Sequence, residues 1–167
     1  MTRPTLTMYH PNCNGTGSAI RLELHPAHDD TAGSIMATIA TQLTIWNGLG
    51  AVPPVYPQFD WDGAITVKLD FTDICKMLQV FRGECESIED GRGLFHKSTR
   101  GTTKIMLRHL VEPIHGYMLE VYRNTHGSED SNARIFLAPY EALGLATAIE
   151  SSMGVICFGI PMVIPHV

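Results

Sequence analysis

Residues 64–83, AITVKLDFTDICKMLQVFRG, change their hydrophobic period halfway along. Over residues 65–69 apolar and polar side chains alternate, which is typical of a half-buried strand. Over residues 74–81 the apolar side chains recur at helical spacing, which places them on one face of a helix. Asp70 or Thr72 can cap that helix, and Gly83 can end it. The stretch therefore predicts a strand that runs directly into a helix.

Residues 133–149, ARIFLAPYEALGLATAI, repeat this pattern near the C-terminus. Glu141 takes the place of Asp73, and an acidic side chain in the first turn suits the positive end of the helix dipole. Pro139 is also favoured at the start of a helix. Few residues are identical, so the similarity lies in the pattern. Such a repeat predicts two pseudo-equivalent halves, about residues 5–83 and 93–158, within one domain that spans residues 1–167.

Six further segments are predicted to be strands, because they alternate or are bounded by turn-forming residues. Together with residues 64–69 and 133–137 they give four strands and a helix, twice. Hairpin-connected strands followed by a helix indicate antiparallel sheets with helices packed on one face. We therefore expect an α+β fold with two four-stranded antiparallel sheets. The six segments are residues 5–9, 18–25, 34–41, 93–97, 102–110 and 117–123.

The composition limits the possible partners. The chain has 167 residues, of which 44% are hydrophobic, and this is enough for one ordinary core. Its formal net charge of −5 opposes a general attraction to polyanions. A nucleic-acid site would therefore have to be a local basic patch on an otherwise acidic surface.

The cysteines and the N-terminal residues favour a reducing compartment. The four cysteines form no C-x-x-C pair, and Cys75 and Cys157 lie in apolar helical patterns that predict buried thiols. Free thiols suit a reducing compartment, so we expect a cytoplasmic protein. The N-terminal residues lack the basic start and apolar run of a secretion signal. No uninterrupted apolar stretch reaches the length that crosses a bilayer, so we expect no membrane partner.

Four short segments point to a known group of proteins. They are GSIMATIA at residues 33–40, FDW at 59–61, LDFTDI at 69–74 and LFH at 94–96. In order and approximate spacing they resemble the Whirly proteins and the wider PC4-like superfamily of single-stranded nucleic-acid-binding proteins. The resemblance extends over residues 15–160, nearly the whole chain. Only the aromatic-Asp-Trp step and the Phe-His step are close to literal matches.

The resemblance implies two antiparallel sheets set against each other and helices that pack subunits into a tetramer. It also implies that single strands of nucleic acid lie along the sheet edges. The chain departs from the family in the strand that is rich in lysine in plant Whirly proteins. Here that strand, residues 17–22, contains Arg21 as its only basic residue.

A protein that binds single strands needs aromatic faces for the bases and cations for the phosphates. Five aromatic residues are considered as stackers: Trp46, Phe59, Trp61, Phe95 and Tyr122. We expect Trp46 and Tyr122 to be exposed and to stack on bases, and Trp61 and Phe95 to pack in the core. Lys104 and Arg108 share one face of a predicted strand. The predicted phosphate contacts are Lys68, Lys97, Arg100, Lys104, Arg108 and Arg134.

The eight histidines raise the alternative of a metal-dependent hydrolase. Its best candidates are His25, His28 and Asp29, which follow a predicted strand. Isolated His and Asp residues in a turn are usually solvated, however. The sequence contains no nucleophile elbow, phosphate loop or dinucleotide fingerprint. We therefore expect no enzyme, no metal site and no cofactor.

The sequence thus predicts a non-catalytic protein that binds single-stranded DNA or RNA with low sequence specificity, in transcription or genome maintenance. We expect self-association through the helical face, as a dimer or a tetramer. The competing hypothesis is an oligomeric scaffold or protein-interaction module of the same fold that has lost nucleic-acid binding. The net charge of −5 favours this alternative. The residues do not discriminate DNA from RNA.

Overall fold

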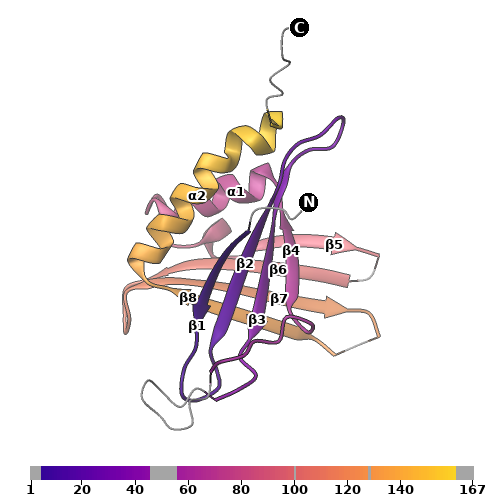
Figure 1. Cartoon of the computed structure of the whole chain (residues 1–167). Coiled ribbons are helices and arrows are strands. Elements are labelled where there is room, and N and C mark those ends of the chain that lie inside the picture. The colour runs from indigo at the N-terminus through magenta and orange to yellow at the C-terminus, as the bar shows by residue number, and fades with distance from the viewer. Residues whose placement is uncertain (1–4, 46–55, 100, 128, 161–167) are drawn as a thin grey trace, which may run out of the picture.

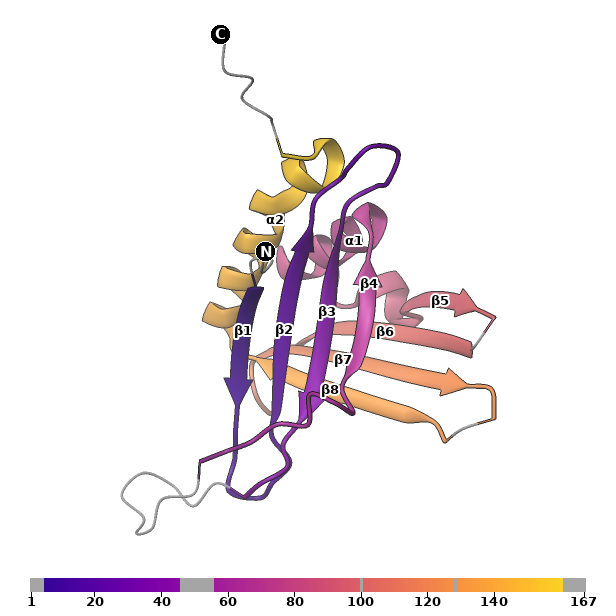
Figure 2. The same cartoon turned by 45° about the vertical axis from the view of Figure 1, so that its right-hand side comes forward.

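Two four-stranded antiparallel sheets form the framework of the computed structural model, which describes residues 5–45, 56–99, 101–127 and 129–160. In each sheet the strands follow one another in chain order. The strands of one sheet run across those of the other (Figure 1, Figure 2). Sheet 1 contains β1 (Thr5–His10), β2 (Ser18–His25), β3 (Ser34–Thr41) and β4 (Ile65–Leu69), and sheet 2 contains β5 (Leu94–Ser98), β6 (Gly101–Leu110), β7 (Gly116–Thr125) and β8 (Ser131–Leu137).

The predicted α+β fold class and the repeated order of four strands and a helix are confirmed. Strand boundaries differ by two residues at most from those expected. The largest differences are in β7 and β8. Asn124 and Thr125 extend β7 by pairing with β6, and Ser131 and Asn132 extend β8 by pairing with β7, beyond the apolar alternation that marks the buried part of a strand.

Both helices begin with a carboxylate that accepts a backbone hydrogen bond. In α1 (Phe71–Phe81), Asp70 Oδ1 accepts from the Asp73 backbone N at 2.9 Å, and Asp73 Oδ2 accepts from the Asp70 backbone N at 3.2 Å. In α2 (Pro139–Phe158), Glu141 Oε2 accepts from the Ala138 backbone N at 2.9 Å. These bonds satisfy N–H groups that have no partner inside the helix. A short 3₁₀ helix, η1 (Ile88–Gly91), precedes β5.

The carboxylates of Asp73 and Glu141 also contact histidines from the opposite half of the chain. His96 Nε2 in β5 lies 2.9 Å from Asp73 Oδ2. His10 Nε2 in β1 lies 2.9 Å from Glu141 Oε1. Each contact becomes an ion pair when the imidazole is protonated. The first strand of each half is therefore tied to the start of the other half's helix.

One continuous apolar core fills the space between the inner faces of the two sheets and the helices. Alternation along each strand sends every second side chain into this core. Both halves of the chain contribute to it. Sheet 1 supplies Ile20, Leu22, Ile35, Ile39 and Val67, and sheet 2 supplies Ile105, Leu107, Leu119, Val121 and Ile135.

Helix α2 exposes large apolar side chains on its outer side. Tyr140, Leu143 and Phe158 are 76%, 70% and 89% exposed. In length and composition α2 could cross a membrane, although Glu141 and Glu150 interrupt its apolar sequence. Its inner side packs on α1, β2, β7 and β8, with Leu145 and Ile149 buried. It is therefore part of the fold, with an apolar side that no described residue covers.

All four cysteines are free thiols. The predicted burial is wrong for Cys157, which is exposed, and Cys75 is half-buried. The apolar residues of α2 continue around the helix, so its hydrophobic pattern does not select one buried face. Contact with the sheets makes that selection instead.

Candidate nucleic-acid interface

The outer face of sheet 2 gathers cationic and aromatic side chains. Ile105 and Leu107 point into the core, so the alternate residues of β6 point outward. The strand register places Phe95, Lys104 and Tyr122 side by side across three strands. We call this surface the sheet-2 face, and it comprises Phe95, Lys97, Lys104, Arg108, Tyr122 and Arg134.

The aromatic residues of the sheet-2 face are open to solvent. Phe95 is 55% exposed and Tyr122 is 44% exposed. The expectation that Phe95 packs in the core is wrong, because alternation in β5 sends Leu94 inward and Phe95 outward. The Lys104 Nζ atom lies 5.5 Å from the centre of the Phe95 ring, within the range of a cation–π contact. Lys104 and Tyr122 also line two adjacent shallow hollows of this face.

Three of the cations on the sheet-2 face are free of carboxylate partners and one is not. Among the described residues, Lys97, Lys104 and Arg134 have no carboxylate within ion-pairing distance. Arg108 Nη2, in contrast, lies 2.6 Å from Oε2 of the buried Glu120. The charge of Arg108 is therefore largely compensated within the protein.

Glu120 also affects Tyr122. The Tyr122 hydroxyl donates to Glu120 Oε1 at 3.2 Å. Burial raises the pKa of the Tyr122 hydroxyl above its usual value, and the negative charge of Glu120 raises it further. The phenol therefore stays neutral and keeps its ring available for stacking.

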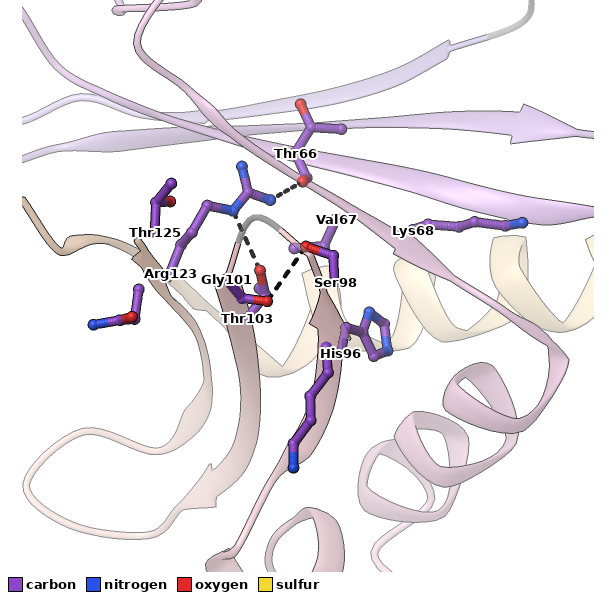
Figure 3. Close-up of a pocket in the computed structure, with 11 residues that line it drawn as sticks. Thr66, Val67, Lys68, His96, Ser98, Gly101, Thr103, Arg123 and Thr125 are labelled. Carbon is purple, nitrogen blue, oxygen red and sulfur yellow. Dashed lines mark hydrogen bonds between the residues drawn. The ribbon is translucent and has the colours of Figure 1, made fainter. Parts of the chain in front are cut away.

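A cleft of about 350 Å³ opens between strand β4 and the end of sheet 2 that carries Ser98, Gly101 and Thr125 (Figure 3). We call this end the free end of sheet 2. Arg123 of β7 lies between the two sheets in this cleft (Figure 3): its Nε donates to Thr103 Oγ1 at 3.2 Å and its Nη2 donates to the Thr66 backbone carbonyl. Of the residues that the structure describes, no Asp or Glu lines the cleft. We call it the inter-sheet cleft, and its polar lining comprises Thr66, Lys68, His96, Lys97, Ser98, Thr103, Arg123, Asn124 and Thr125.

Lys97 connects the inter-sheet cleft with the sheet-2 face. Lys97 belongs to both, because it lines the cleft and follows Phe95 on the outer side of β5. Lys68 is exposed on β4 and has no carboxylate within ion-pairing distance in the described part of the chain. Arg123 was not among the predicted site residues. Alternation places it on the inner side of β7, a position that suggests core packing and gives no sign of a polar cleft beyond the core.

A second aromatic cluster covers the outer face of sheet 1. Tyr9 lies 5.4 Å from Phe59 and 6.4 Å from Trp61 between ring centres. The Arg21 guanidinium lies 4.1 Å from the centre of the Trp61 ring. Trp61 is half-buried here and lies outside the main core, so its predicted core position is wrong. Because Arg21 already occupies its face, Trp61 is a weaker candidate for base stacking than Phe95 or Tyr122.

Six of the eight predicted site residues can be placed. Lys68 and Lys97 line the inter-sheet cleft, and Lys97, Lys104, Arg108, Tyr122 and Arg134 lie on the sheet-2 face. Trp46 and Arg100 lie outside the described residues. The fold thus brings the six together on one side of sheet 2 and its free end, although their roles stay predictions.

The alternative metal site does not assemble around His25, His28 and Asp29. His28 Nδ1 lies 2.6 Å from Asp29 Oδ2, and both side chains are largely exposed. His25 Nε2 lies 3.0 Å from Glu23 Oε1. Within the described ranges, no group of three or more His, Cys, Asp or Glu side chains is arranged to hold a metal ion.

Comparisons with known proteins bear on the fold. No protein-family model and no curated protein sequence matches the chain. Among solved structures it is similar to WHY1 from Arabidopsis thaliana, with a TM-score of 0.74, 14% identity, and coverage of 95% of this chain and 87% of that one. The chain has the Whirly fold. The resemblance inferred from the sequence is therefore confirmed at the level of the fold.

Two further structures share the Whirly fold with this chain. The plant transcriptional regulator PBF-2 is 17% identical, with a TM-score of 0.68 and coverage of 93% of this chain and 83% of that one. One chain in the structure of a guide-RNA-binding protein complex bound to a guide RNA is 15% identical, with a TM-score of 0.61 and coverage of 92% of this chain and 91% of that one. TM-scores of this size establish a common architecture, and the roles of individual residues follow from the geometry of this chain alone.

Proposed function

We propose that this protein binds single-stranded DNA or RNA without catalysis and with low sequence specificity. The observation that carries the proposal is the convergence of uncompensated cations in a chain whose net charge is −5. Lys97, Lys104 and Arg134 lie on the sheet-2 face with two exposed aromatic rings, and Lys68 and Lys97 line the adjoining inter-sheet cleft. Local attraction for phosphates can therefore exist within an acidic protein.

The surface explains low specificity in physical terms. Bases of any identity can stack on the rings of Phe95 and Tyr122, because every base has a π-face. Lysine and arginine attract phosphates regardless of the base attached to them. A duplex hides its base faces, so the same surface favours an unpaired strand. One structural neighbour is a guide-RNA-binding protein complex bound to a guide RNA, and this supports a nucleic-acid ligand for the shared architecture.

We further propose that the protein self-associates through α2 in the cytoplasm, as a dimer or a tetramer. The support is the row of exposed apolar side chains on the outer side of the helix, including Tyr140, Leu143 and Phe158. A patch of this kind on a folded domain marks an interaction surface. The four free thiols support a reducing compartment.

The test is fluorescence anisotropy with labelled oligothymidine, oligouridine and a duplex of the same length, at low and at increasing salt. We expect both single strands to bind, the duplex to bind more weakly, and the affinity to fall steeply with salt. The double variant Lys97→Ala/Lys104→Ala should bind more weakly than the wild type. Arg82→Ala is the control, because Arg82 is paired with Glu150 of α2 at 2.6 Å and belongs neither to the sheet-2 face nor to the inter-sheet cleft.

The second candidate function is a scaffold or protein-interaction module. The observation that favours it is the net charge of −5, together with the compensation of Arg108 by Glu120. This module would bind no single strand even at low salt and would still self-associate. Absence of binding by all three oligonucleotides therefore rejects the nucleic-acid proposal and supports the scaffold.

A further inference from the structure

Two histidines at one end of the β6–β7 hairpin face each other. The Nε2 atoms of His109 and His115 are 3.0 Å apart. Four other histidines contact carboxylates: His10, His25, His28 and His96. In the described part of the chain, His109 and His115 instead pair with each other, so their ring nitrogens are not committed to an acidic partner.

The surrounding residues fix the position of His109. Its ring stacks on Tyr117 at 4.8 Å between centres, and its backbone N donates to the Glu86 carbonyl at 2.8 Å. Tyr117 in turn packs against Phe81 at 5.3 Å, and its hydroxyl donates to the Phe81 carbonyl. A ring held in this way loses little further freedom when it binds a ligand.

We propose that His109 and His115 together bind one divalent transition-metal ion, with Cu²⁺ preferred and Ni²⁺ second. With metal–nitrogen bonds of about 2.0–2.1 Å, the observed separation of 3.0 Å corresponds to an angle of about 90–97° at the ion. Square-planar and tetragonal Cu²⁺ or Ni²⁺ sites have adjacent ligands near this angle. A tetrahedral Zn²⁺ site would need the two nitrogens about 3.3 Å apart.

Binding of the ion requires a change of tautomer and a turn of one ring. In the present pair one ring donates an Nε2–H to the other, so one Nε2 carries a proton. When the ion binds, that proton moves to Nδ1 of the same ring, and both Nε2 lone pairs face the metal. His115 is exposed, so its ring can turn to meet this geometry. Water completes the coordination, since no third His, Cys, Asp or Glu joins the group among the described residues.

This site is separate from the proposed nucleic-acid surface. His109 lies near the end of β6 and His115 lies in the connection just before β7, whereas the inter-sheet cleft lies at the opposite end of the same two strands. A failure of nucleic-acid binding therefore leaves the metal proposal intact, and the reverse also holds.

The test is a titration of the purified full chain with Cu²⁺ by isothermal calorimetry, with electron paramagnetic resonance of the one-equivalent complex. The exposed thiols of Cys13 and Cys157 are first alkylated with iodoacetamide, because free thiols reduce Cu²⁺. We then expect one tight site per chain and a tetragonal spectrum with coupling to two imidazole nitrogens. In His115→Gln we expect affinity at this site to fall at least about tenfold, because even changes to outer-shell partners of metal ligands cost about 10–100-fold. His28→Gln, which changes a largely exposed histidine elsewhere, should retain the site.

The outcomes are distinct. Equal Cu²⁺ affinity in the wild type and in His115→Gln, or a wild-type spectrum without two coupled nitrogens, overturns the proposal. Because His115 is exposed, its replacement should leave the fold intact, which circular dichroism verifies. A second variant, His109→Gln, must give the same loss of affinity as His115→Gln, since the ion needs both rings.

Discussion

The salt dependence of single-strand binding should reveal which cations contact phosphates. Each phosphate neutralised on a single strand contributes about −0.7 to the slope of log K against log salt. The four uncompensated cations Lys68, Lys97, Lys104 and Arg134 therefore give an expected slope of about −2.8. Between 50 and 200 mM salt, such a slope weakens binding about 50-fold.

Lys104→Ala should lower the magnitude of this slope to about 2.1 and weaken binding at every salt concentration. The matched control is the double variant Arg108→Gln/Glu120→Gln, which keeps the net charge and removes the pair that is held at 2.6 Å. Because Glu120 already compensates Arg108, the double variant should leave the slope close to the wild-type value.

Fluorescence anisotropy over a salt series measures both slopes, and the free energy of unfolding of each variant shows whether the fold persists. The reasoning is refuted if Lys104→Ala has the wild-type slope. It is also refuted if the double variant loses as much slope as Lys104→Ala, because Arg108 would then contact a phosphate despite Glu120.

Three further predictions concern single elements. Tyr122→Ala should weaken single-strand binding by about 1–3 kcal/mol, whereas Tyr122→Phe should leave it unchanged, and an equal effect of both variants in anisotropy would contradict stacking. Because the pKa of Tyr122 is raised, ionisation of its hydroxyl should cause no loss of single-strand binding by the wild type as the pH rises towards about 10. Asp73→Ala should lower the free energy of unfolding by about 1–2 kcal/mol in urea denaturation, because it removes a cap contact and the partner of His96, and an unchanged midpoint would disprove that role. Leu143→Glu should reduce the molar mass measured by light scattering while circular dichroism stays unchanged, and an unaltered mass would exclude this side of α2 as the subunit contact.

Much of the fold could be predicted because its signals are local. Alternation over residues 65–69 and helical spacing over residues 74–81 follow from the backbone periods of strand and helix. The same alternation correctly placed Lys104 and Arg108 on one outer face of β6. Asp73 and Glu141 were recognisable as helix-start residues because capping depends only on neighbours in the sequence.

The candidate site was only partly predictable, because its charges depend on strand register and on the packing of two sheets. Lys104 and Arg108 have the same local pattern, yet only Arg108 meets a buried carboxylate, and the β6–β7 register decides this. Phe95 and Trp61 were expected in the core, but β5 turns Phe95 outward into solvent, and the segment before β4 places Trp61 against Arg21.

The sequence by itself therefore determined the order of strands and helices, the inward and outward sides of each strand, and the residues that start both helices. These properties depend on contacts within a few residues along the chain. The tertiary structure alone decided that Arg123 reaches the Thr66 carbonyl, that His96 joins Asp73, and that His109 meets His115. Such contacts arise only when the two sheets pack across each other and a hairpin closes, because distant segments then share one surface.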